Sequence, residues 1–331
     1  MVKTISMTTA QLTDQLSLPV VAAPMFLISG PELVISCCKN GIVGTFPALN
    51  QRSSQGFEEW LIQIKTELAQ WEEETGKKAA PYGVNLIVHG SNPRLQADLM
   101  LCMKHKVPLI ITSLGAVSDV VNAVHSYGGV VFHDVIKKRH AEKAQEAGVD
   151  GLILVCAGAG GHAGVNNPMP FIRETREFFD GTLLLAGAMS SGQDVASALQ
   201  MGADLAYMGT RFINTDESKA TDEYRDMIIN AGCSDIVYTA AISGVSANFL
   251  GASLQAAGIT EEQMKAKAKV DFGKEMDTEA KAWKTIWSAG QGSATVKDSM
   301  PTAALIDRMK AEFKAAIEKQ IENLKKYCYI V

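Results

Sequence analysis

Short, almost wholly apolar segments alternate with longer amphipathic segments over the first 212 residues. Eight of the apolar segments have the length and composition of strands. They are apolar at nearly every position rather than at every second one, which is typical of parallel strands buried on both faces. The predicted strands are 20–26, 42–49, 82–88, 108–114, 130–136, 151–157, 182–188 and 205–212.

The segments between these strands carry helical signals. In GQDVASALQMG, for example, the apolar positions Val195, Ala198 and Leu199 recur at helical spacing. Several predicted helices end in a glycine, the usual stop signal, at Gly41, Gly128, Gly148 and Gly202. Eight strands alternating with helices predict an α/β fold, a (β/α)8 TIM barrel over residues 1–212. A doubly wound sheet is the alternative, and it is disfavoured because no GxGxxG follows the first strand.

The pattern changes after Phe212. Residues 213–300 combine irregular and helical stretches, and we expect them to form a mostly helical region over one face of the barrel, which the family resemblance given below implies is a substrate-covering insertion. Residues 301–331 predict a long C-terminal helix that packs on the barrel, or whose apolar stripe is an interface of a homo-oligomer.

Composition narrows the class of protein. The 331 residues are 47% hydrophobic and carry a net charge of −5, which suits a large core and gives no sustained basic stripe for nucleic acid. The short basic run at 137–140 is interpreted as solvated helix surface. No run of eighteen apolar residues predicts a membrane span, and the first residues lack the apolar core of a signal peptide. Six cysteines without a CxxC pair argue against a metal site or disulfides, so a reduced, cytoplasmic protein is expected.

In a barrel of this kind the functional groups gather at the C-terminal ends of the strands. These ends are rich in glycine and other small residues and poor in carboxylates, which argues against glycoside or metal chemistry. They include Pro24, Met25, Asn85, Ser113, His133, the glycine run to His162, Gly187, Ala188, Gly209 and Thr210.

The last two strand ends predict a phosphate site. Gly187 with Ala188, and Gly209 with Thr210, follow the seventh and eighth strands, where barrels commonly bind phosphate through backbone N–H groups. Either glycine alone is read more simply as a turn. As a pair at these two ends, they favour phosphate.

The other strand ends indicate what carries that phosphate. Ala23, Pro24 and Met25 offer a backbone edge of little bulk for a flat ring, and Asn85 and Ser113 can hydrogen-bond ring carbonyls or a polyhydroxyl chain. These features fit flavin mononucleotide (FMN) better than a sugar phosphate. The alternative for Asn85, equally supported by the sequence, is that it caps its own loop.

The segment VCAGAGGHAG places His162 after Gly158, Gly160 and Gly161. The glycines would let the loop lie close to the ring, and His162 would project over it. Histidine titrates near neutral pH, so His162 is the candidate general base for a carbon-bound proton. The plainer alternative is a histidine that donates to a loop carbonyl. His133 either faces the site or caps the next helix.

These motifs resemble those of the nitronate monooxygenase family. The resemblance rests on AAPM (22–25), GVNL (83–86), AGAGGHAG (157–164), AGAMSSGQDVASALQMGAD (186–204) and MGTRF (208–212). It implies an FMN barrel that oxidises alkyl nitronates, or nitroalkanes as a second substrate class, with molecular oxygen to carbonyl compounds and nitrite. Through it His162 corresponds to the catalytic base. The implied flavin contacts are Ala23, Pro24, Met25 and Asn85, with Gly187, Gly209 and Thr210 at the phosphate.

One departure concerns the fifth strand, where some branches of the family carry a basic residue near the flavin and this chain reads His133-Asp134. Similar FMN barrels are NAD(P)H-dependent quinone reductases or enoyl-thioester reductases, and these remain alternative functions. A non-catalytic flavin or phosphate binder is a third, although it gives His162 no task. The sequence does not identify the physiological substrate.

Overall fold

A computed structural model describes residues 12–115, 118–242, 244–264 and 286–328. Its centre is a closed barrel of eight parallel strands, in which β9 returns to pair with β1. The predicted TIM barrel is therefore confirmed, and every predicted strand segment contains an observed strand. The strands are β1 (Val20–Ala22), β2 (Val43–Pro47), β3 (Tyr82–Ile87), β4 (Leu109–Ser113), β5 (Val130–Val135), β6 (Gly151–Val155), β8 (Thr182–Ala186) and β9 (Leu205–Met208).

All eight predicted strands are longer than the observed ones, and the first and the last differ most. The first ends at Ala22, so Ala23, Pro24 and Met25 form a loop at the barrel mouth. The last ends at Met208, and Thr210–Ile213 form the short helix α9 instead. In both cases the apolar run continues because the residues beyond the strand are also covered by other parts of the chain.

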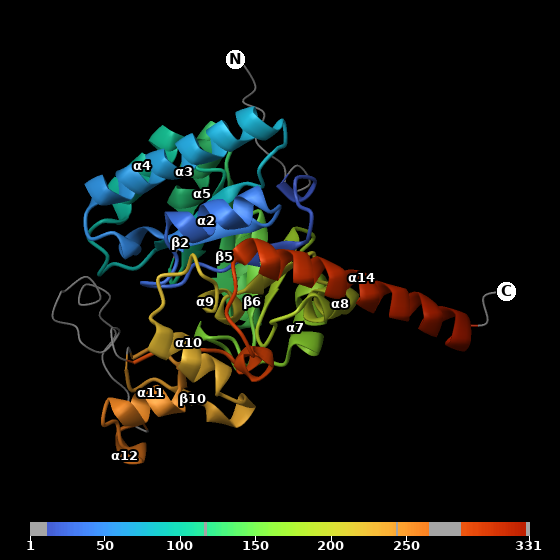
Figure 1. Ribbon diagram of the computed structural model, residues 1–331. Helices are drawn as coiled ribbons and strands as arrows, with labels where there is room; N and C mark the ends of the chain where they lie inside the picture. Colours follow the sequence, from blue (N-terminus) through green and yellow to red (C-terminus); the bar gives the residue numbers. More distant parts are fainter. Residues whose placement is uncertain (1–11, 116–117, 243, 265–285, 329–331) are drawn as a thin grey trace.

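Helices surround the barrel (Figure 1). The predicted glycine stops are confirmed, because Gly41, Gly128, Gly148 and Gly202 all have positive φ angles at or next to helix ends. At the other end of α8, Ser191 and Asp194 form a capping box. The helices are α2 (Pro31–Lys39), α3 (Ser54–Thr75), α4 (Leu95–His105), α5 (Ser118–Tyr127), α6 (Lys138–Glu146), α7 (Pro168–Arg176) and α8 (Gly192–Met201), with a 3-10 turn at Ala48–Asn50.

The barrel interior is filled by alternate residues of the strands. Leu109, Ile111, Phe132, Ile153 and Leu184 belong to one buried apolar cluster inside it. The layer nearest the C-terminal strand ends differs, since Asn85, Ser113, Asp134 and Tyr207 line a cavity there. The apolar layers of the barrel interior therefore lie directly beneath the polar residues of this cavity and support them rigidly.

The region after the barrel contains strands that the hydrophobic pattern did not predict. β10 (Ile236–Thr239) and β11 (Ala247–Leu250) pair antiparallel, and β11 also pairs with the two-residue β7 (Gly161–His162). Strands this short carry too few positions for a periodicity. Residues 265–285 of this region lie outside the described part of the chain. The helical elements are α10 (Asp222–Ile229), α11 (Gly251–Ala256), α12 (Glu261–Met264) and the 3-10 turns Cys233–Asp235 and Gln291–Thr295.

The C-terminal helix α14 (Thr302–Tyr327) packs its first half against α8 and α2. Arg211, which is 1% exposed, donates to the carbonyl and carboxylate of Asp298, and Arg308 pairs with the same carboxylate. This cluster ties the end of the barrel to the start of α14. No helix in the described ranges is both long and apolar enough to cross a membrane.

Candidate active site

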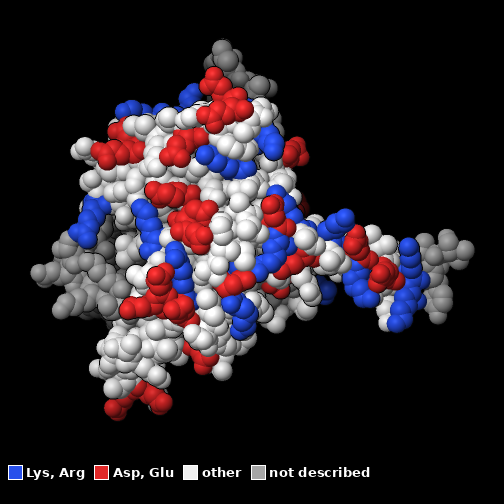
Figure 2. Space-filling view, in the orientation of Figure 1, with Lys and Arg blue, Asp and Glu red and all other residues white. Residues whose placement is uncertain are grey.

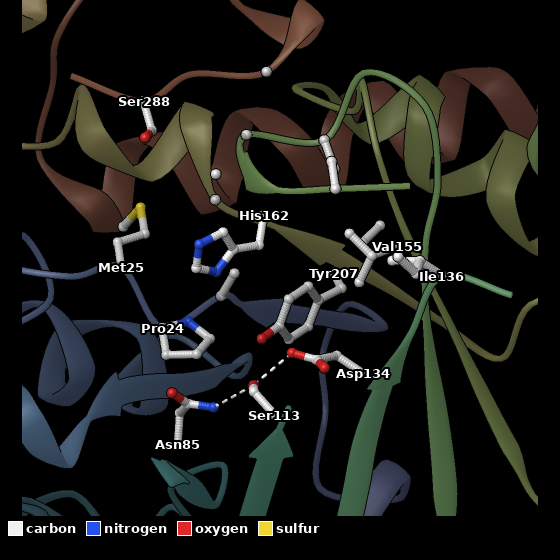
Figure 3. Close-up of a pocket in the computed structure, with 18 of the residues that line it drawn as sticks. Pro24, Met25, Asn85, Ser113, Asp134, Ile136, Val155, His162, Tyr207 and Ser288 are labelled. Atoms are coloured by element: carbon white, nitrogen blue, oxygen red, sulfur yellow. Dashed lines mark hydrogen bonds between the residues drawn. The ribbon is translucent and has the colours of Figure 1, made fainter. Parts of the chain in front are cut away.

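A cavity of about 1550 Å³ opens at the C-terminal ends of the barrel strands (Figure 3). It exceeds the roughly 300–1,000 Å³ of a typical small-molecule pocket, so it has room for a cofactor and a substrate together. All the site residues predicted from the sequence line it, namely Ala23, Pro24, Met25, Asn85, Ser113, Gly160, Gly161, His162, Gly187, Ala188, Gly209 and Thr210.

His162 is held by the small sheet rather than by a free loop. Within β7 it lies opposite Ala247 of β11, and its imidazole points into the cavity near Pro24 and Tyr207 (Figure 3). Burial lowers its pKa to about 4. The expectation that it titrates near neutral pH was therefore wrong, because the sheet and the cavity walls remove the water that would solvate an imidazolium. His162 is neutral at pH 7.

One of the glycines before His162, Gly160, is needed for packing against another loop. A Cβ on Gly160 would lie 2.8 Å from the Gly290 nitrogen and 3.0 Å from the Ala289 carbonyl carbon. The Gln291 N–H also donates to the Gly158 carbonyl at 2.8 Å. Sequence analysis attributed these glycines to a flat ligand, whereas at Gly160 a neighbouring backbone already imposes the requirement. The 289–292 segment thereby fixes the position of the loop that carries His162.

The two predicted phosphate-binding strand ends are neighbours in the barrel. Gly187 and Ala188 have φ angles of +136° and +55°, so this turn uses left-handed backbone. A Cβ on Gly209 would meet nothing closer than 3.6 Å, which leaves the cavity side of this glycine uncrowded. The Thr210 hydroxyl accepts from the Gly290 N–H at 2.9 Å, and its own proton remains a donor.

Asn85 and Ser113 belong to one hydrogen-bonded chain. The Asn85 amide donates to the Ser113 hydroxyl at 3.0 Å, and that hydroxyl donates to the Asp134 carboxylate at 2.5 Å (Figure 3). The Asn85 amide donates to the Ile111 carbonyl as well, at 3.3 Å. The donors that sequence analysis assigned to a ligand are thus engaged with the protein, and they orient a carboxyl group.

His133 and Asp134 point to opposite faces of β5. The His133 ring bonds the Thr112 hydroxyl at 2.8 Å, so it does not cap the next helix, and burial together with nearby His140 lowers its pKa to about 4. Asp134 faces the barrel interior, and burial raises its pKa to about 6 despite the hydrogen bond from Ser113. Asp134 is therefore the carboxyl group at the centre of the site.

The raised pKa of Asp134 predicts a pH-dependent gain in stability for Asp134→Asn. Ionisation of the buried carboxyl favours the unfolded chain and so lowers the stability of the folded protein. This loss of stability is absent below pH 4, grows as pH rises from about 4 to 6, and is complete above that. Asparagine keeps an acceptor for Ser113 and removes the charge. In the flavin-free protein, Asp134→Asn should be more stable by on the order of 2–3 kcal/mol at pH 8 and equal near pH 4.

Thermal unfolding of both proteins at pH 4, 6 and 8 measures this difference. Asp180→Asn is the matched control, since Asp180 is exposed and should give no pH-dependent difference. An Asp134→Asn protein that is no more stable than the parent at pH 8 would contradict the assignment.

Sequence analysis missed three residues of the site. It treated Asp134 only as a departure from a family pattern. Tyr207 gave a weak signal, as an interior position of the last strand, and burial with the nearby Asp134 raises its pKa. Ser288 gave no signal. It lines the cavity, and its buried hydroxyl has no hydrogen-bond partner among the described residues.

Two further observations bound the chemistry. In the described part of the chain, no group of three or more His, Cys, Asp or Glu side chains is arranged to hold a metal ion. Lys137 and His140, interpreted from the sequence as helix surface, are exposed and also line the outer edge of the cavity.

Ser288 is held in the cavity wall by Tyr224. The Tyr224 hydroxyl donates to the Ser288 carbonyl, and the Tyr224 ring stacks on Trp287 with ring centroids 4.9 Å apart.

Comparison with known proteins identifies a family through its family model. The model of the family described as nitronate monooxygenase matches residues 9–312. A nitronate monooxygenase of Paraburkholderia phytofirmans is 24% identical over 91% of this chain and 93% of its own length. A nitronate monooxygenase of Neurospora crassa is 25% identical over 91% of this chain and 90% of its own length.

Two solved structures share the fold. FabK from Thermotoga maritima superposes with a TM-score of 0.78 at 21% identity, covering 95% of this chain and 98% of its own. A nitroalkane oxidase from Streptomyces ansochromogenes superposes with a TM-score of 0.75 at 22% identity, covering 93% of this chain and 99% of its own. At these identities the structures support the barrel alone.

Proposed function

The chain belongs to the nitronate monooxygenase family, and from that premise we propose that it binds FMN and oxidises alkyl nitronates with molecular oxygen to carbonyl compounds and nitrite. The observation that carries the proposal is the placement of His162. The small sheet holds its imidazole inside the same cavity as the Ala23–Met25 loop and the glycine-containing ends of β8 and β9. A base, a flat floor and an anion-binding edge thus share one space.

The residues present fit FMN. Gly187, Ala188, Gly209 and Thr210 would hold its phosphate, because the adjacent ends of β8 and β9 bring together backbone N–H groups, the uncrowded Gly209 and the Thr210 hydroxyl. The Ala23-Pro24-Met25 loop would lie under the ring, with Asn85 at the ring's polar edge and Gly160 and Gly161 beside it. The unpaired Ser288 hydroxyl is a donor that a bound ligand would satisfy. When bound, FMN supplies the electron acceptor.

His162 would act on the proton of the substrate carbon. A neutral imidazole can accept the α-proton of a nitroalkane, but a pKa of about 4 makes it a weak base. A nitronate has already lost that proton and requires no base. The electrostatics of the site therefore favour the pre-formed nitronate as substrate over the parent nitroalkane.

Asp134 would act through orientation and charge. Its carboxyl is fixed by Ser113, which is fixed in turn by Asn85, so the three form a rigid polar floor beneath His162 (Figure 3). Because the substrate is an anion, it would bind on the His162 side of the cavity, away from this carboxyl. Oxygen uptake and nitrite release with a nitronate as the sole reductant test the proposed reaction.

A further inference from the structure

The second half of α14 extends away from the rest of the molecule (Figure 1). Every residue from Glu318 to Cys328 is exposed, including Ile321 at 48%, Leu324 at 45% and Tyr327 at 65%. Residues 314–328 make about four turns of helix, roughly 22 Å long at 1.5 Å per residue. A helix of that length is marginally stable in water without a packing partner.

The exposed half continues the apolar face that packs on the body. Leu305, Ile306 and Met309 are buried in the core, and Phe313 packs against the same cluster. Ile317, Ile321 and Leu324 follow on that face at spacings of four and three residues. The same stripe that attaches α14 to the barrel thus runs beyond the barrel into solvent.

We propose that this projecting stripe is a dimer interface, in which two copies of the chain pack their α14 ends antiparallel around a twofold axis at Ile321. Ile321 would meet its own counterpart on the axis. Ile317 of each copy, four residues before Ile321, would pack near Leu324 of the other copy, three residues after Ile321. Such an isologous contact uses one stripe on both copies.

The charges beside the stripe favour a second copy of this chain as its binding partner. Glu318 lies three residues before Ile321 and Lys325 four residues after it, on the same flank of the helix at about 100° per residue. Antiparallel packing sets each Glu318 beside Lys325 of the other copy, whereas parallel packing would put this flank of the two helices on opposite sides of the interface and leave Glu318 without Lys325 as a partner. Glu318 is 62% exposed and only 3.9 Å from Lys314 Nζ, a loose contact that leaves it available. The mixed charges along this helix are visible in Figure 2.

Sedimentation velocity on the full-length holoprotein tests the proposal. We expect a species of about twice the 35.5 kDa chain mass that dissociates on dilution. Ile321→Glu puts two carboxylates face to face on the axis and should give monomer at concentrations where the parent is dimeric. Asn323→Glu adds the same charge about 200° around the helix from Ile321 and should stay dimeric.

A charge exchange separates loss of the interface from loss of the helix. Glu318→Lys alone should weaken the dimer, and Glu318→Lys with Lys325→Glu should restore it, because the exchanged pair is again complementary. Far-ultraviolet circular dichroism of the parent, Glu318→Lys and the double variant should be the same at a protein concentration high enough for all three to be dimeric. A monomeric parent, a dimer that survives Ile321→Glu, or a double variant no stronger than Glu318→Lys would each overturn the proposal.

Discussion

Replacing His162 with alanine is expected to reduce kcat/KM for a neutral nitroalkane by about 10²-fold, the low end of the usual contribution of a general base, because a pKa of about 4 makes His162 a weak base. The same change should reduce kcat/KM for the pre-formed nitronate of the same carbon skeleton far less. The difference arises because only the nitroalkane carries an α-proton for His162 to remove. The two substrates therefore report separately on proton transfer and on the oxidation that follows it.

The measurement is oxygen uptake by the parent protein and the variant with each substrate, under conditions where nitroalkane and nitronate interconvert slowly. His125→Ala is the control, since His125 pairs with Asp150 on the barrel wall and lines no part of the cavity. Equal losses on both substrates would contradict the role of His162 as a base and would indicate a role in binding or loop structure.

The second large effect is expected at Gly290. A Cβ at this position would lie 2.7 Å from the Gly160 nitrogen, closer than a Cβ approaches a non-bonded atom, and would be closer still to the Gly158 carbonyl oxygen. Gly290→Ala should therefore separate the 289–292 segment from the loop that carries His162. Overpacking of this kind costs about 1–3 kcal/mol of stability. Because Thr210 accepts from the Gly290 N–H, FMN affinity should fall as well.

Gly90→Ala is the matched control, because a Cβ at Gly90 meets no atom within 4 Å. Urea unfolding measures the stability, and quenching of flavin fluorescence on titration with FMN measures the affinity. If Gly290→Ala matches Gly90→Ala in both measurements, the contact between the two loops does not position the site.

The barrel could be predicted from the sequence because its determinants are local. Each strand is a continuous apolar run that ends near a glycine or a polar residue, and the parallel topology brings all the C-terminal ends to one face. That is why residues as distant as Asn85, His162 and Gly209 could be assigned to one cavity. The strand-end residues favoured FMN as the cofactor, and the resemblance then added the expected reaction, which the pattern alone left open.

The features that the sequence did not predict depend on contacts between distant segments. The pKa of His162 is set by burial in a sheet whose other strands are formed by residues 236–239 and 247–250. The requirement for glycine at 160 comes from residues 289 and 290. Ser113 became a partner of Asp134 rather than a free ligand donor through the pairing of β4 with β5. No local periodicity encodes these contacts.

The most direct test of the proposed function is an anaerobic absorbance titration of the purified protein. One sample receives propionate 3-nitronate, and parallel samples receive NADH or NADPH. The proposed function predicts that the nitronate alone bleaches the flavin absorbance and that the nicotinamides do not. Rapid bleaching by a nicotinamide, with no response to the nitronate, would contradict it and assign the chain to a reductase branch; a colourless protein unable to bind added FMN would contradict the cofactor site itself.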